Sequence, residues 1–106
     1  MHKRNAFLAV AALCVAFVAT AQADGKAKAM VCTACHGPDG NSSNPIWPNL
    51  AAQNPSYIVA QLKAFKAGTR QNASMAPMVA SLAEGDMEEI ANFFAAQTLK
   101  VKPLAA

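Results

Sequence analysis

Two cysteines and a histidine are the residues of this sequence best placed to do chemistry: Cys32, Cys35 and His36, in the segment Cys-Thr-Ala-Cys-His. In an α-helix, positions i, i+3 and i+4 lie on one face. The three side chains are therefore expected to meet one bound group beside the end of a helix. Thiols and an imidazole at this spacing serve disulfide exchange, zinc binding or covalent haem attachment.

The rest of the sequence favours haem attachment. A thioredoxin-like oxidoreductase needs a βαβ scaffold around its C-x-x-C, and no such pattern is present. A structural zinc site needs four nitrogen or sulfur ligands, and only these three remain when Cys14 and His2 are removed with the leader described below. Covalent attachment uses all three, through two thioether bonds and an imidazole bond to iron. We expect one covalently bound haem c.

Two methionines, Met75 and Met78, are candidates for the sixth coordination position of the iron. They lie on either side of Pro77, which favours the first position of a helix and an extended residue before it. Met78 would then lie inside a short helix and pack in the core, whereas Met75 would lie in an extended loop with a free thioether. We expect Met75, with Met78 as second choice. An open sixth position, with both methionines in the core, is the remaining alternative.

Residues 1–23 have the organisation of a secretory signal peptide. The basic pair Lys3-Arg4 precedes an apolar run of 14 residues, Ala6–Ala19, and Ala21-Gln22-Ala23 is an A-x-A cleavage site. The run is shorter than the ~20 apolar residues that span a bilayer, which disfavours a retained anchor. We expect a periplasmic protein of a Gram-negative bacterium, with residues 24–106 as a single domain and no membrane span after cleavage.

Length and charge restrict what the exported chain can be. A domain of about 80 residues buries a thin core and commonly depends on a cofactor. The formal net charge of +3 falls to +1 without the leader, with seven Lys or Arg against six Asp or Glu. Because this balance comes with no basic stripe, nucleic acid is not an expected partner.

Helical patterns dominate the remaining sequence, and no alternating strand pattern is present, so the expected fold class is all-α. The predicted elements are a first helix at Asp24–Cys35, a loop at 37–55, a helix from Pro55 to Gly68 capped by Asn54, a loop at 69–76, a helical turn at Pro77–Leu82, a last helix at Glu84–Thr98 and a loose tail at Lys100–Ala106. The apolar residues Ile58, Leu62 and Phe65 mark the buried face of the second helix.

Taken together, the sequence resembles the small bacterial class I cytochromes c, which are periplasmic electron carriers. The segments that carry this resemblance are Cys32–Gly37, Asp39–Asn41, Trp47–Ala51, Gln53, Tyr57, Gln61-Leu62, Lys66–Gly68 and Met87–Phe94. The resemblance implies the class I cytochrome c fold, with about four short helices around one covalently bound haem and the last helix crossing the first at Gly25 or Ala27. Ala83 departs from the family, where a serine commonly caps the last helix, at a cost of about 1 kcal/mol.

The resemblance also implies roles for residues near the haem. The sixth ligand lies seven residues before the leucine that matches Leu82, which again indicates Met75. The backbone carbonyl of Pro48 is expected to accept the second ring N–H of the axial histidine. Trp47, Gln53 and Tyr57 are expected to line the haem or contact its propionates, and plain packing is the alternative for these three.

The expected function is electron transfer between transient redox protein partners. An iron with histidine and methionine on its two sides has no free position, and no acid–base pair accompanies it, so an enzyme is not expected. A haem protein with an open or labile sixth site, acting in ligand binding or peroxidase-like chemistry, is one alternative, and a cytochrome subunit of a larger oxidoreductase is another. Lys63, Lys66 and Arg70 are either helix-end cations or a docking rim for an acidic partner.

Overall fold

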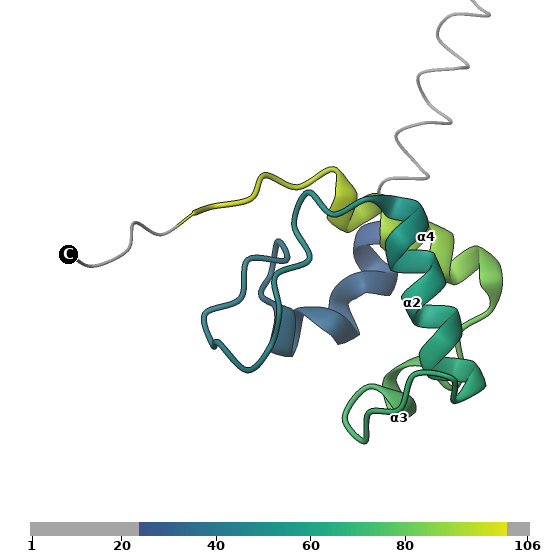
Figure 1. Ribbon diagram of the computed structural model, residues 1–106. Helices are drawn as coiled ribbons and strands as arrows, with labels where there is room; N and C mark the ends of the chain where they lie inside the picture. The colour runs from purple at the N-terminus through teal and green to yellow at the C-terminus, as the bar shows by residue number, and fades with distance from the viewer. Residues whose placement is uncertain (1–23, 102–106) are drawn as a thin grey trace, which may run out of the picture.

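Four helices make up the regular structure of residues 24–101, the part of the chain that the computed structural model describes (Figure 1). The first helix covers residues 24–36 and is followed by α2 (Pro55–Ala67), α3 (Ala76–Val79) and α4 (Glu84–Ala95). No strand occurs between residues 24 and 101, and the predicted all-α fold class is confirmed. The predicted leader, 1–23, and the end of the predicted tail, 102–106, lie outside the described residues.

The limits of α2 are those predicted from its capping residues. The side-chain oxygen of Asn54 accepts hydrogen bonds from the backbone N–H groups of Ser56 and Tyr57, at 2.9 and 3.4 Å. Pro55 occupies the first turn, where a missing N–H has no cost. At the other end Gly68 has a left-handed φ of 77° and stops the helix.

The last two helices differ from their predicted limits. α3 begins one residue earlier and ends three residues earlier than the predicted turn, and α4 ends three residues before Thr98. Beyond α4, the Thr98 carbonyl accepts a hydrogen bond from Asn41 Nδ2 at 2.9 Å, and the Lys100 N–H donates to Asn41 Oδ1 at 2.7 Å. These bonds to a distant loop take the place of another helical turn.

The first helix crosses α4 at a point where the two backbones touch. A Cβ on Gly25 would lie 2.7 Å from the carbonyl oxygen of Glu89, so a side chain cannot be accommodated there without movement. The expected crossing is therefore confirmed at Gly25, whereas Ala27 is exposed. Lys28 adds two ion pairs across the same contact, each at 2.9 Å, to Asp86 and Glu89.

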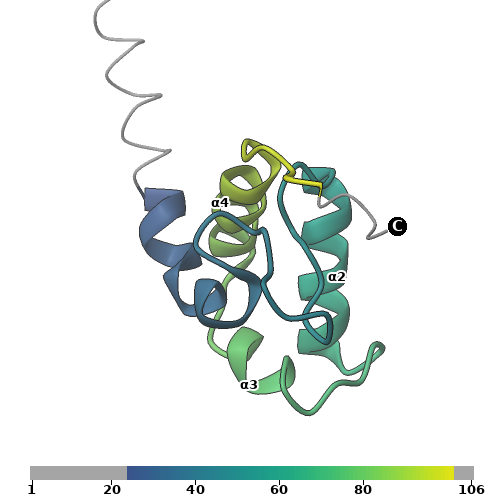
Figure 2. The ribbon, with the colours of Figure 1, turned by 90° about the vertical axis from the view of Figure 1, so that its left-hand side faces the viewer.

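One apolar cluster joins the four helices. In Figure 2 α4 lies between the first helix and α2, and α3 closes one end. The buried members of the cluster are Ala29, Ile58, Leu62, Val79, Met87, Ile90, Ala91 and Phe94. Phe65, predicted for the buried face of α2, is only partly buried. Between residues 24 and 101, no helix combines the length and apolar character needed to cross a membrane.

Candidate functional site

His36 is the last residue of the first helix. It is 7% exposed, which makes it the buried polar residue among residues 24–101. Its Nδ1 lies 2.8 Å from the backbone carbonyl oxygen of Pro48, the partner that the resemblance implies. A carbonyl oxygen can only accept a hydrogen bond, so Nδ1 carries the ring proton. The lone pair of Nε2 is then available to a metal.

Cys32 and Cys35 lie on the same helix as His36 and are free thiols. Cys32 is half-buried against the core and Cys35 is exposed. Burial raises the pKa of the Cys32 thiol. Their helical spacing places both sulfur atoms on the side of the helix that also carries the imidazole.

A tight turn after the first helix brings Pro48 back toward it. Gly37 has a left-handed φ of 88°, and a Cβ there would lie 2.2 Å from the carbonyl oxygen of Asn41, so only glycine fits. Further along, the Gly40 carbonyl accepts a hydrogen bond from the Leu50 N–H at 2.7 Å. This bond joins the two sides of the loop and holds the segment that contains Pro48 in place.

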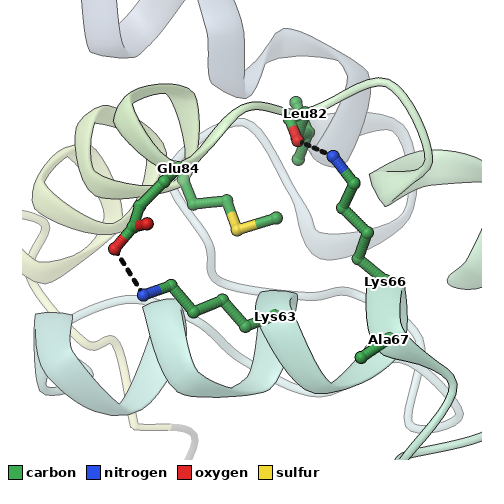
Figure 3. A pocket seen from close by; sticks show the side chains of 6 residues that line it. Lys63, Lys66, Ala67, Leu82 and Glu84 are labelled. Carbon is green, nitrogen blue, oxygen red and sulfur yellow. Dashed lines mark hydrogen bonds and ion pairs between the residues drawn. The ribbon is translucent and has the colours of Figure 1, made fainter.

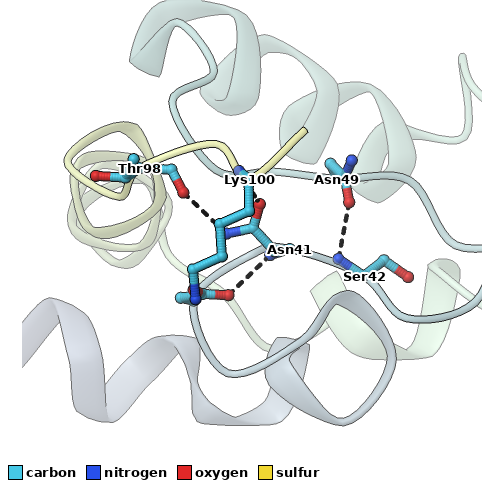
Figure 4. A network of polar contacts seen from close by, with 6 residues as sticks. Asn41, Ser42, Asn49, Thr98 and Lys100 are labelled. Atoms are coloured by element: carbon cyan, nitrogen blue, oxygen red, sulfur yellow. Dashed lines mark hydrogen bonds and ion pairs between the residues drawn. The ribbon is translucent and has the colours of Figure 1, made fainter. Parts of the chain in front are cut away.

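A polar network ties the tail after α4 to this loop (Figure 4). Besides the two bonds of Asn41 already described, Lys100 Nζ lies 2.9 Å from Asp39 Oδ2. The Lys100 ammonium, together with N–H groups of Asn41, lowers the pKa of Asp39 to about 2. Asn49 Oδ1, next to Pro48, accepts a hydrogen bond from the Ser42 N–H at 2.8 Å. This bond connects the start of the loop to the segment that contains Pro48.

Met75 packs against the core immediately before α3 and is partly buried. The extended conformation predicted for it is wrong, because its φ of −83° and ψ of −33° are right-handed helical. Asn72 Oδ1 accepts the Met75 N–H at 3.0 Å, and the Asn72 carbonyl accepts the Ala76 N–H at 3.0 Å. These bonds build a helical turn that outweighs the preference of the residue before proline for an extended shape.

Met78 was expected to pack in the core, and this prediction is also wrong, since Met78 is 40% exposed. Val79, 1% exposed, is the buried residue of α3. The side of α3 that faces the core therefore carries Val79 and not Met78. Of the two candidate ligands, Met75 is the one in contact with the interior.

The three further residues that the resemblance indicated have different degrees of exposure. Trp47 is half-buried in the loop that contains Pro48. Gln53 is exposed, and its Oε1 accepts the N–H of Asn54 at 2.9 Å. Tyr57 is 51% exposed in the first turn of α2. The structure therefore does not bury Gln53 and Tyr57 with His36.

Two lysines of α2 form contacts across an open groove between α2 and the start of α4 (Figure 3). Lys63 Nζ lies 2.5 Å from Glu84 Oε1, and this partner lowers the pKa of the Glu84 carboxyl. Lys66 Nζ donates to the backbone carbonyl oxygen of Leu82 at 2.5 Å. The sequence near the end of α2 predicted cations there, but it did not indicate which groups these lysines contact.

Arg70 has fixed partners as well. Its guanidinium lies over the Phe65 ring, 4.5 Å from the centroid, and its Nη1 donates to Gln61 Oε1 at 2.7 Å. Sequence reasoning missed these contacts and also the roles of Asn41 and Asn72. Asparagines in loops are known to cap turns, which is the one signal that could have indicated Asn72.

Comparison with known proteins identifies the family. The sequence pattern of the Cytochrome c family matches residues 22–98. The chain belongs to the cytochrome c family. It is 51% identical over 74 residues to cytochrome c4 of Thiocapsa roseopersicina, covering 69% of this chain and 38% of that protein. It is 38% identical over 78 residues to cytochrome c-554(548) of Halomonas halodenitrificans, covering 71% of this chain and 94% of that protein.

A solved structure of a relative has the same fold. The crystal structure of reduced recombinant cytochrome c4 from Pseudomonas stutzeri matches with a TM-score of 0.70 and 40% identity, over 73% of this chain and 45% of that chain. The expected class I cytochrome c fold is thereby confirmed. This chain spans less than half the length of these cytochromes c4.

The donor atoms of the site fit a haem c. Two unpaired thiols and an imidazole with a free Nε2 share one helix end, and a partly buried thioether lies on the same core. Cytochrome c membership and the Cys-x-x-Cys-His arrangement together show one covalently bound haem c.

Proposed function

We propose that this cytochrome c carries single electrons, with its haem joined to Cys32 and Cys35 and bound axially by His36 and Met75. The bound haem supplies an iron that takes up and gives back one electron. The observation that supports this proposal most directly is the 2.8 Å hydrogen bond from His36 Nδ1 to the Pro48 carbonyl. It fixes the tautomer, orients the ring and leaves Nε2 for the iron.

Each of the other residues has a defined part. Cys32 and Cys35 hold the haem at two points, which prevents its loss. Met75 is partly buried, and Asn72 holds its backbone, so less conformational freedom is left to lose when its thioether binds. A thioether ligand raises the reduction potential relative to an anionic ligand. The side chain of Met78 is 40% exposed, whereas Met75 packs against the core, so Met75 remains the preferred ligand.

Two methionine variants test the axial assignment. We expect Met75→Ala to abolish the sulfur-to-iron charge-transfer absorption and to lower the reduction potential, because the thioether is lost. Met78→Ala is the matched control and should retain both properties. The opposite pattern would assign the ligand to Met78, and retention of the absorption in both variants would show that neither methionine is the ligand.

We propose that the protein acts as an electron carrier and not as an enzyme. With both axial positions filled, no coordination position is left for a substrate, and the only histidine of residues 24–101 is assigned to iron. A labile or open sixth site is the competing function. Carbon monoxide added to the reduced protein distinguishes them: slow or incomplete binding supports the carrier, and rapid complete binding supports the open site.

We further propose that residues 1–23 direct export and that the carrier meets its redox partners transiently in the periplasm. Brief encounters between redox proteins bury little surface and depend on charge mainly for their rate. The intact mass of the periplasmic protein should show the loss of residues 1–23 and the addition of one haem. Co-elution of the native protein with a larger oxidoreductase on size exclusion would instead indicate a bound subunit.

A further inference from the structure

The segment that carries Met75 is attached to α2 at both of its ends. At the start, the Arg70 N–H donates to the Ala64 carbonyl at 3.1 Å, and the Arg70 guanidinium stacks on Phe65. At the end, Lys66 Nζ donates to the Leu82 carbonyl at 2.5 Å (Figure 3). Arg70, just after α2, and Lys66, within it, therefore hold the two ends of this segment against the helix.

Hydrogen bonds connect the Lys66 attachment to Met75 without a break. The Leu82 N–H donates to the Val79 carbonyl at 3.1 Å, and the Val79 N–H donates to the Met75 carbonyl at 3.3 Å. Val79 is 1% exposed and Leu82 is partly buried, so both are packed on the core. Leu82 and Met75 are thus connected by two backbone hydrogen bonds and a packed side chain.

We propose that Lys66 is a positioning residue for the sixth iron ligand, and that it acts through the Leu82 carbonyl and the segment 75–82. An ammonium donor makes a stronger hydrogen bond to a carbonyl than a neutral donor does, and the groove between α2 and α4 leaves this bond on the surface, where it can be changed without altering the core. This proposal rests on the proposed axial role of Met75.

Three variants of the intact haem protein test it. Lys66→Met keeps an unbranched side chain and removes the donor, and Lys66→Arg restores a cationic donor. Lys63→Met is the matched control, because it removes the same charge from the same helix but breaks the Glu84 ion pair instead. Imidazole added to the oxidised protein competes with the methionine, and hydrogen exchange at the Val79 and Leu82 amides measures local opening.

We expect Lys66→Met to raise the apparent affinity for imidazole about threefold to tenfold and to speed exchange at both amides by a similar factor. Lys66→Arg should restore most of the wild-type behaviour, and Lys63→Met should change neither readout. The proposal is wrong if Lys66→Met leaves both readouts unchanged, or if Lys63→Met has the same effect.

The Met75→Ala variant separates failure of this proposal from failure of the axial assignment. If Met75→Ala keeps the charge-transfer absorption, the axial assignment is wrong, and with it the claim that Lys66 positions the ligand. If Met75→Ala loses the absorption while Lys66→Met behaves as wild type, the assignment stands and the positioning role alone is overturned.

Discussion

A single hydrogen bond determines which ring nitrogen of His36 can bind a metal. Cys32, Cys35 and His36 were predicted as one group from their spacing, because a helix brings i, i+3 and i+4 together. The partner of the ring N–H could not be derived in this way. It is the backbone carbonyl of Pro48, and a backbone atom leaves no mark in the residue types. Only the family resemblance indicated it.

Asp39 makes the attachment of the tail sensitive to acid. Its pKa is lowered from 3.8 to about 2, chiefly by the Lys100 ammonium. A lowered pKa in the folded state means that the ion pair contributes fully above the ordinary pKa and loses its contribution as the pH falls from about 4 to about 2. We expect the backbone amide of Lys100 to show this transition in an NMR pH titration.

Asp39→Asn should remove the transition at Lys100, because the amide side chain does not titrate. Glu88→Gln is the control, since it removes a carboxylate from an exposed position of α4. A titration of the Lys100 amide that is unchanged in Asp39→Asn would show that another group is responsible.

Among the elements, α2 was predictable and the end of α4 was not. Asn54, Pro55 and Gly68 cap α2 locally, so its limits can be derived from the sequence. The end of α4 depends on Asn41, which is far away in the chain and captures the Thr98 carbonyl. The prediction for the local conformation of Met75 was wrong for a related reason. Asn72 stabilises a helical turn that the following proline alone would disfavour.

The start of α4 has half of a capping box. The Ala83 N–H donates to Asp86 Oδ2 at 2.9 Å, but the alanine side chain returns no hydrogen bond to the helix. Ala83→Ser should supply the missing acceptor and raise the free energy of unfolding by about 1 kcal/mol. Denaturant unfolding measures this change, and Ala96→Ser, at the other end of α4, should have an effect near zero. Equal effects at both ends would contradict the capping explanation.

The crossing of the first helix and α4 depends on the absence of a side chain at Gly25. Gly25→Ala places a Cβ 2.7 Å from the Glu89 carbonyl oxygen, and we expect a loss of about 1–3 kcal/mol in the free energy of unfolding. Gly85→Ala, within α4, meets nothing within 4 Å and should gain up to about 0.5–1 kcal/mol from better helix propensity. Thermal unfolding of both variants would check this, and a neutral Gly25→Ala would show that the helices can separate there at no cost.

At the scale of the whole molecule, the protein core alone is small. Most members of the buried cluster come from α2 and α4, and the half-buried side chains of Cys32, Leu50, Met75 and Leu82 lie at its edge. Small domains of this kind commonly need a cofactor to remain folded. The all-α class and the covalently bound haem were both predictable from composition and motif, without knowledge of the packing.

Removal of the haem attachment should have a large effect on folding. We expect the double variant Cys32→Ala/Cys35→Ala, when it carries no haem, to lose about half or more of the helical circular dichroism signal. Thr33→Ala is the control within the same motif, because it removes only an exposed hydrogen bond to the Met30 carbonyl. A haem-free double variant with a wild-type spectrum would show that the polypeptide core is sufficient.

The contact between Gly25 and Glu89 also limits when the first helix can reach its final packing. Residues 24–36 are synthesised before α4, yet the surface on which they rest is supplied by α4. Contacts between distant parts of a chain slow folding, since loop closure must precede them. The nascent polypeptide must therefore keep its cysteines on an unsupported segment until synthesis has passed Glu89.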